Sequence, residues 1–274
     1  HQYIVLEDFH YLKSEVQKDF AIELKAFHES SELCFIIVGV WLDENKLVIY
    51  NGDLTGRIVP VNADLWNEDE LREVIQKGED FLNIRFKESF TSEAIKASSG
   101  NVYIVQETCH RACNESGIHK TVVGERRLVG DGLNARSLVA EIIQEQSGRY
   151  NAFITNYASG FQETALAMHK WLLYPILTSS IEELSKGLTY RSIRSKITSG
   201  HPQGKNLNPG NITQALKAVS SLQLSKSIQP IILDYDESNL TLHIVDKGFL
   251  IWLSMQDRNE LLSTCLLYTS PSPR

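Results

Sequence analysis

The sequence has no apolar run that approaches the roughly 20 residues of a membrane-spanning helix, so we expect no membrane partner. It has only four cysteines, without the spacing of a disulfide framework, which indicates a reducing, cytoplasmic setting. Positive charge is in deficit, with 27 Lys and Arg against 34 Asp and Glu and a net charge of −7. This balance excludes a chain coated in nucleic-acid-binding charge and leaves a local basic face open.

Neither end of the sequence has the form of a natural terminus. The chain begins at His1 and not at Met, with no visible signal peptide, so we expect its true start to lie upstream. Residues 265–274 resemble the translation of a sequencing adapter and are left out of the fold prediction, with a Ser- and Pro-rich disordered tail as the alternative. The remaining length can bury a sizeable core and allows about two domains.

The most informative stretch is the apolar run at residues 3–6, which leads directly into two carboxylates, Glu7 and Asp8. A continuous apolar run is typical of a strand buried on both faces, as in a parallel sheet. Acids at the carboxyl end of such a strand lie where α/β sheets bind ligands. This is the form of a Walker B strand in a P-loop ATPase. A strand that ends in a solvated Glu-Asp turn is the alternative.

A second apolar run at residues 33–40 follows a helical pattern in which Val16, Phe20, Leu24 and Phe27 recur at spacings of four and three. Strand, helix and strand predict a right-handed βαβ unit. In a P-loop ATPase the second strand carries sensor 1, a polar residue that faces the γ-phosphate. Residues 39–42 offer none, which leaves a degenerate sensor 1 or a role for Asp43 or Asn45.

Arg57 lies between two turn signals and a predicted short strand at residues 58–61. An arginine just before the last strand of the core is where AAA+ proteins carry an arginine finger, which stabilises transition-state charge on a neighbouring subunit's phosphates. A surface ion pair on a loop is the alternative.

Three helices are predicted after this segment. Asn67 is expected to cap a helix at 68–77 that Gly78 stops, and further helices are predicted at 91–98 and 102–114. Cys109 and Cys113 lie four residues apart on the last of these helices, which is typical of core positions. With His110 and His119 they do not match the spacing of common zinc sites.

The C-terminal part predicts a winged helix. After a loop at 120–132 and helices at 135–145 and 161–177, two more helices are expected at 188–197 and 211–222. Strands at 230–235 and 240–245 then form a hairpin. If this module binds double-stranded DNA, the second helix enters the major groove. The candidate contacts are Arg191, Arg194, Lys196, Lys205, Asn211, Thr213, Gln214 and Lys217. Asp236 and Glu237 at the hairpin tip would repel phosphate, so protein contacts are the alternative.

Four segments in order, residues 6–12, 36–41, 52–57 and 69–71, resemble AAA+ ATPases of the origin-recognition-complex-like group. The resemblance covers about residues 2–120, with a continuation to 258. It implies an α/β plus α fold: a truncated P-loop ATPase core with a parallel sheet, a helical lid and a C-terminal winged helix. The implied boundaries are 1–66 for the core, 67–119 for the lid, 120–179 for a linker with helices, 180–258 for the winged helix and 265–274 for the tail.

The resemblance also implies site residues, cofactors and partners. Glu7 would hold Mg²⁺ through water, Asp8 would activate the attacking water, and Arg57 would be catalytic in a homo-oligomer that uses ATP and Mg²⁺. Glu7 departs from the usual Asp at the first position. The larger departure is that no Gly-x-x-x-x-Gly-Lys-Ser/Thr phosphate loop occurs, so the chain alone is expected not to bind or hydrolyse ATP.

The intact parent is expected to couple Mg-ATP hydrolysis to a conformational or assembly change, and whether that change takes place on DNA is left open. Two alternatives stay open. The first is a non-catalytic DNA-binding or protein-interaction adaptor with a relict nucleotide site. The second is a signalling NTPase of a defence system.

Overall fold

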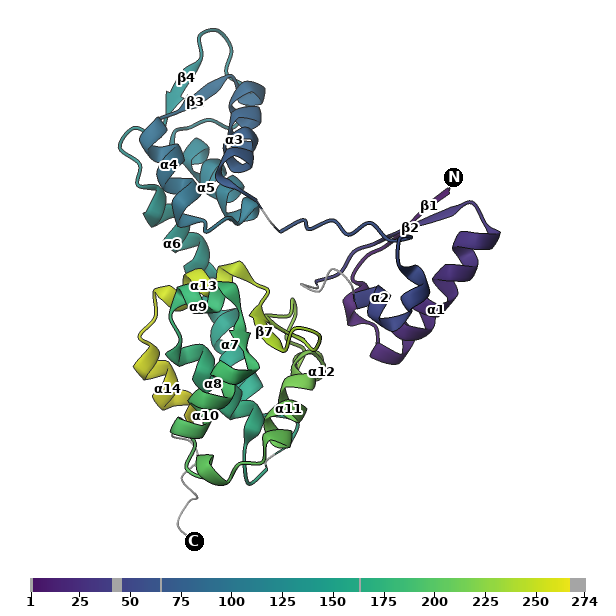
Figure 1. Ribbon diagram of the computed structural model, residues 1–274. Coiled ribbons are helices and arrows are strands. Elements are labelled where there is room, and N and C mark those ends of the chain that lie inside the picture. Colours follow the sequence, from purple (N-terminus) through teal and green to yellow (C-terminus); the bar gives the residue numbers. More distant parts are fainter. Residues whose placement is uncertain (1, 41–45, 65, 163, 267–274) are drawn as a thin grey trace. The chain divides into compact units, whose positions relative to one another are not determined.

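The computed structural model describes residues 2–40, 46–64, 66–162 and 164–266 as helices, strands and connections (Figure 1). Contacts within the chain divide it into two units, each built from two separate stretches of sequence. One unit contains residues 1–62 and 159–245, and the other contains residues 63–158 and 246–274. The fold is α/β, with many helices, two small parallel sheets and one antiparallel sheet among the described residues. No described helix combines the length and the apolarity that a membrane crossing requires.

The first stretch, up to residue 62, forms a βαβ unit. Its elements are β1 (Gln2–Leu6), the short 3-10 helix η1 (Phe9–Tyr11), α1 (Ser14–Ser30), β2 (Leu33–Ile37), α2 (Lys46–Tyr50) and η2 (Gly52–Leu54). β1 and β2 pair in parallel, with Ile4 opposite Phe35 and Leu6 opposite Ile37, which confirms the predicted pairing. The buried core under one face of this sheet consists of Phe9, Ala21, Leu24, Leu47 and Leu54.

The predicted strand at residues 58–61 is wrong. The segment belongs to no strand, and Val59 and Val61 are 85% and 83% exposed. An extended segment becomes a strand only when a neighbour supplies backbone partners, and Pro60 itself has no N–H to donate. Residues 58–61 have the apolar pattern of a strand, but no strand among the described residues pairs with them.

The described residues of the second stretch of the same unit form six helices, one of them a 3-10 helix, and three strands. They are α8 (Met168–Thr178), α9 (Ile181–Lys186), β5 (Leu188–Thr189), α10 (Tyr190–Gly200), η3 (Gly204–Asn206), α11 (Pro209–Lys217), α12 (Val219–Ser225), β6 (Leu233–Asp236) and β7 (Thr241–Ile244). The strands form an antiparallel sheet in the order β5-β7-β6. Leu242 of β7 lies opposite Leu188 on one side and Tyr235 on the other. The predicted hairpin is therefore present.

Three predicted helices in this region differ from the observed ones. The helix expected from residue 188 starts at Tyr190, because Leu188 and Thr189 pair with β7 as a strand. The helix expected at 161–177 starts only at Met168, after Ala167 in the left-handed region at φ 43°. The helix expected at 211–222 is broken at Ala218, which ends α11 and begins α12.

The other unit is mainly helical. It contains α3 (Glu68–Leu82), β3 (Ile84–Phe86), α4 (Glu88–Ala97), α5 (Val102–Glu115), β4 (Arg127–Val129), α6 (Ala135–Glu145), α7 (Ser147–Ala158), α13 (Lys247–Ser254) and α14 (Arg258–Leu266). The Asn67 side chain accepts from Glu70 N at 2.9 Å while Glu70 accepts from Asn67 N, the predicted helix start. The predicted stop at Gly78 is wrong, because the helix continues to Leu82 and ends at Asn83, which is left-handed at φ 54°.

Sequence reasoning also missed five elements in this unit: β3, β4, α7, α13 and α14. The predicted loop at 120–132 contains β4, which pairs in parallel with β3, and both strands are only three residues long. Strands this short leave no readable alternation of side chains. α13 and α14 pack against α7, so the C-terminal helices complete this unit. Cys265 and Leu266, predicted as tail, belong to α14, and residues 267–274 lie outside the described residues.

Candidate functional site

The two predicted acids lie together in an exposed turn directly after β1. Glu7 and Asp8 are both exposed, and neither carboxylate forms a hydrogen bond or ion pair with the described residues. Asp8 adopts the left-handed conformation, φ 56° and ψ 27°, which Asp tolerates better than most residues. The turn projects both carboxylates into solvent at the carboxyl end of the strand.

A backbone hydrogen bond and the packing of Phe9 hold this turn in place. Phe9 N donates to Val38 O at 3.0 Å, so the chain stays alongside β2 after the strand itself ends. The Phe9 ring is buried against Phe20, with the ring centroids 5.3 Å apart. Burial and the nearby Asp8 carboxylate together raise the pKa of Tyr11. The two exposed acids are thereby anchored next to the buried Phe9.

Arg57 does not join these acids within the chain. Its Nη1 donates to Glu29 Oε1 at 2.9 Å, in a partly exposed ion pair. Glu29 is the penultimate residue of α1, whereas Glu7 and Asp8 precede the start of that helix. The 17 residues of α1 make the helix about 25 Å long, so the arginine and the acids lie near opposite ends of it.

The oxygen atoms of Glu7 and Asp8 are the type of ligand that Mg²⁺ prefers, and their exposure leaves room for bound waters. No group of three or more His, Cys, Asp and Glu among the described residues is arranged to hold a metal ion directly. The sensor 1 alternatives Asp43 and Asn45 lie outside the described residues.

The predicted nucleic-acid contacts lie on α10, η3 and α11. Arg191 and Arg194 are exposed one turn apart on α10 and form no ion pair with the described residues. Lys196 is half-buried, and its Nζ donates to Thr178 O at 3.4 Å. The side chain of Lys205 lies outside the described part of the chain.

On α11, two of the candidate DNA-contact side chains are already bonded within the chain. Thr213 Oγ1 donates to Pro209 O at 3.2 Å, so its hydroxyl is already used within the helix. Gln214 is exposed and Asn211 half-buried. Lys217 Nζ pairs with Glu237 Oε2 at 2.5 Å, which offsets the one positive charge of this helix.

Both acids at the hairpin tip are held by local contacts. Asp236 is 6% exposed and accepts hydrogen bonds from Ser238 N, Asn239 N and Asn239 Nδ2. Burial raises the pKa of Asp236, but these hydrogen bonds outweigh it and lower the pKa overall. Asp236 therefore shapes the turn and does not face outward, and Glu237 is paired with Lys217. Lys217 therefore offsets the charge of Glu237, while Asp236 keeps its charge inside the turn.

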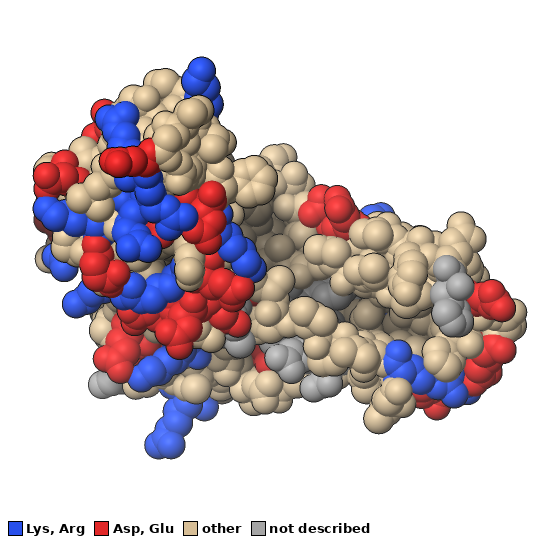
Figure 2. All heavy atoms as spheres, turned by 90° about the horizontal axis from the view of Figure 1, so that it is seen from above, with Lys and Arg blue, Asp and Glu red and all other residues tan. Residues whose placement is uncertain are grey.

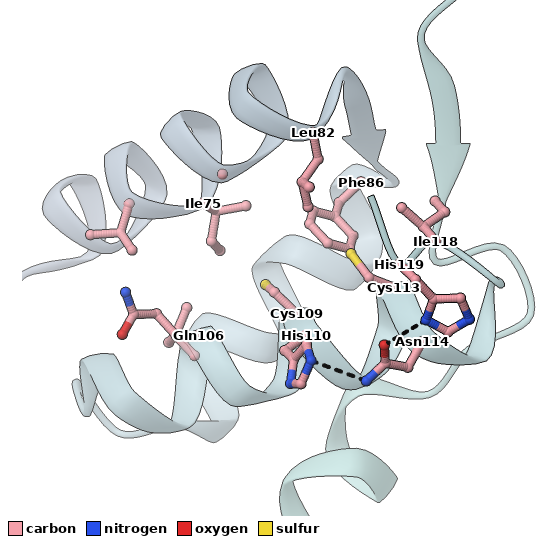
Figure 3. Close-up of a pocket in the computed structure, with 13 residues that line it drawn as sticks. Ile75, Leu82, Phe86, Gln106, Cys109, His110, Cys113, Asn114, Ile118 and His119 are labelled. Carbon is pink, nitrogen blue, oxygen red and sulfur yellow. Dashed lines mark hydrogen bonds between the residues drawn. The ribbon is translucent and has the colours of Figure 1, made fainter. Parts of the chain in front are cut away.

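Sequence reasoning missed a pocket between α3 and α5 (Figure 3), a cavity of about 400 Å³. Its floor is apolar and includes the buried side chains of Ile75, Phe86, Val105, Cys113 and Ile118. Exposed polar side chains line its rim, where Asn114 Nδ2 bonds His110 Nε2 at 3.1 Å and Asn114 Oδ1 bonds His119 Nδ1 at 3.3 Å. The predicted helix ends explain how this rim is positioned.

Asn101 caps the start of α5 by accepting from Ile104 N at 3.2 Å. At the other end, Gly117 N bonds Asn114 O and Ile118 N bonds Cys113 O, with Gly117 at φ 69°. This is a Schellman ending, in which a left-handed glycine turns the chain back on the helix. It folds Ile118 onto the pocket floor and brings His119 to Asn114.

Of the two cysteines of the pocket, Cys113 is buried in the core and Cys109 packs against it, partly buried. Burial raises the pKa of the Cys109 thiol to about 12, with a smaller contribution from Cys113 and Glu79. Burial also raises the pKa of Cys113. Both thiols are therefore neutral at physiological pH.

No protein-family model matches the chain, and no match was found among curated proteins.

Proposed function

We propose that this chain is part of an AAA+ ATPase of the origin-recognition-complex-like group, with residues 1–66 as part of its nucleotide-binding core. The observation that carries the proposal is the one-sided sheet of β1 and β2. Val5 and Ile36 lie opposite each other on its open face and are 54% and 46% exposed. Tyr3 and Val38 extend the same exposed face. Parallel sheets are normally covered on both faces, and two strands are rarely stable alone.

The surface of residues 2–62 supports a larger parent domain. Among the described residues, 11 of the 18 exposed large hydrophobic side chains lie in this stretch, which is less than a quarter of the chain. In Figure 2 the corresponding part, at the right, has long stretches without a charged side chain. Soluble proteins rarely leave such surface open, so further strands and helices are needed to cover it.

The turn after β1 supports the assignment of roles. In the parent protein, Mg²⁺ would neutralise phosphate charge, and the Glu7 carboxylate would hold it through water. Asp8 would accept a hydrogen bond from the attacking water and orient it. Arg57, at the far end of α1, would act on the nucleotide of a neighbouring copy in a homo-oligomer. The phosphates themselves need a loop that this chain does not contain.

The role of Glu7 is tested in the parent ATPase by titrating Mg²⁺ at saturating ATP. Glu7→Gln should raise the Mg²⁺ concentration for half-maximal turnover, because an amide binds the ordered water shell less strongly than a carboxylate. Glu15→Gln, which changes an exposed glutamate of α1, is the matched control and should leave the titration unchanged. Identical Mg²⁺ titrations for Glu7→Gln and wild type would contradict the assignment.

We further propose that residues 180–258 include a winged helix that binds double-stranded DNA. The order of elements supports it: α10 and α11–α12 lie between β5 and β6, and β7 returns between these strands in the sheet. Charge also supports it, because residues 181–245 contain seven Lys and Arg against five Asp and Glu, the reverse of the whole-chain balance. Arg191 and Arg194 are exposed and have no ion-pair partner among the described residues, which leaves them available for phosphate contacts.

Fluorescence anisotropy of the full chain with a labelled duplex tests this second proposal. Arg191→Glu with Arg194→Glu should weaken binding and reduce the slope of log affinity against log salt by about two, since each lost phosphate contact removes about one released counterion. Lys186→Glu with Lys226→Glu makes the same change of charge at one exposed and one half-buried lysine of the module and should have a smaller effect. No binding to any duplex at low salt would favour an adaptor that binds protein.

A further inference from the structure

The pocket between α3 and α5 has a specific origin in the sequence. The apolar stripe of α3 runs through Leu71, Ile75 and Leu82, and the position at 78, where the spacing requires another apolar side chain, is glycine. A helix-interior glycine is unfavourable because of its conformational freedom. It is usually explained by a left-handed backbone or by a close neighbour.

Neither explanation applies to Gly78. Its φ is not positive, and a Cβ built on it would meet nothing within 4 Å. The residue lines the pocket, and the facing side chains from α5 include the small thiols of Cys109 and Cys113 (Figure 3). The combination of a missing side chain on one helix and small ones on the other leaves the cavity open.

The lining is uncharged throughout. None of the 13 residues that line the pocket is Lys, Arg, Asp or Glu, although these types make up 22% of the chain. The polar groups are gathered on the rim, where Gln106, His110 and Asn114 follow one another at intervals of four along α5. Such a division suits a ligand with an apolar body and one polar end.

We propose that the α3–α5 pocket binds a small uncharged molecule with an aromatic or branched aliphatic body and a hydrogen-bonding group at one end. The body would lie on Ile75, Phe86 and Val105, in the space that Gly78 leaves free. The polar group would bond Asn114 or one of the two imidazoles at the rim. A volume of about 400 Å³ lies in the range of small-molecule sites. This proposal is independent of any nucleotide chemistry elsewhere in the chain.

The experiment uses fluorine NMR of the full chain with two probes, fluoroindole and fluorobenzyl alcohol. Saturable binding of at least one probe is expected, and Gly78→Leu should weaken it at least about tenfold by filling the cavity. Gly148→Leu is the matched control. Gly148 is also an exposed glycine within a helix of the same unit, its Cβ would likewise meet nothing within 4 Å, and it lies outside the pocket. Its leucine variant should bind the probe as wild type does.

Both leucine variants should keep the helical fold, because leucine is a better helix former than glycine at both positions. A loss of probe binding would therefore not result from unfolding. Asn114→Ala adds a test of the polar end. This variant should bind fluoroindole or fluorobenzyl alcohol, whichever binds to wild type, severalfold more weakly. A third probe, fluorobenzene, has no hydrogen-bonding group, and its affinity should stay unchanged. The proposal is overturned if neither probe binds saturably, or if Gly78→Leu binds it as tightly as wild type.

Discussion

At the scale of single residues, His243 gives this protein a defined dependence of stability on pH. Burial lowers the pKa of His243, and Asp236 and Asp234 offset part of that effect. The folded state therefore binds this proton at a lower pH than the unfolded chain, whose histidine titrates at about 6.5. The contribution of His243 to the free energy of unfolding is therefore fully present above about pH 6.5. It is lost as the pH falls from there through the lower pKa of His243 in the folded state.

His243→Gln should remove this contribution. The difference in unfolding free energy between pH 7 and pH 5 should be smaller in the variant than in wild type, measured by urea denaturation at each pH. An unchanged pH dependence would show that His243 does not titrate differently in the two states.

At the scale of elements, Gln223 of α12 holds the backbone of β6. Its side chain is fully buried, donates to Leu233 O at 2.7 Å and accepts from Ile232 N at 2.8 Å and Leu233 N at 3.0 Å. β6 leaves its other edge without a strand in the described sheet, so this side chain supplies backbone partners where the sheet supplies none. One residue thus replaces part of a neighbouring strand.

Gln223→Leu should destabilise the protein by about 2–5 kcal/mol, because several buried backbone groups lose their partners. Gln214→Leu changes an exposed glutamine on α11 and should have little effect. Urea unfolding followed by tryptophan fluorescence compares the two. Equal midpoints would mean that solvent or a rearranged backbone satisfies the groups that Gln223 now bonds.

Elements with strong end signals could be predicted from the sequence, and elements without them could not. Asn67 with Glu70 marks a helix start that satisfies unpaired backbone groups, so the start of α3 was located correctly, and α5 lies within one residue of its predicted range of 102–114. The three-residue strands β3 and β4 depend on each other for pairing, which no local pattern records. Gly78 was interpreted as a helix end because composition alone does not separate a terminating glycine from one that leaves a space in the core.

The same reasoning explains the outcome at the candidate site. Glu7 and Asp8 could be predicted because a strand places its following residues at a known edge of the sheet. The pocket could not be predicted, since it depends on which faces of α3 and α5 meet. On the sheet itself, Val5, Ile36 and Val38 are exposed, whereas Ile37 packs on the core.

At the scale of the whole molecule, the parts of the chain should differ in local stability. Amides of β1 and β2 should exchange with solvent much faster than those of β6, β7 and α5, because the open sheet has few buried contacts and two free edges among the described strands. Hydrogen exchange of the full chain measures this directly. Equal protection in all these elements would contradict the view that residues 1–62 belong to a larger core.

The most direct test of the central proposal is turnover of ATP by the parent ATPase carrying Asp8→Asn. The substitution removes the carboxylate proposed to orient and deprotonate water but no phosphate contact. Turnover should therefore fall by a factor of about 100 or more while the dissociation constant for ATP stays near that of wild type. Wild-type turnover in Asp8→Asn would show that the turn after β1 is not a Walker B site.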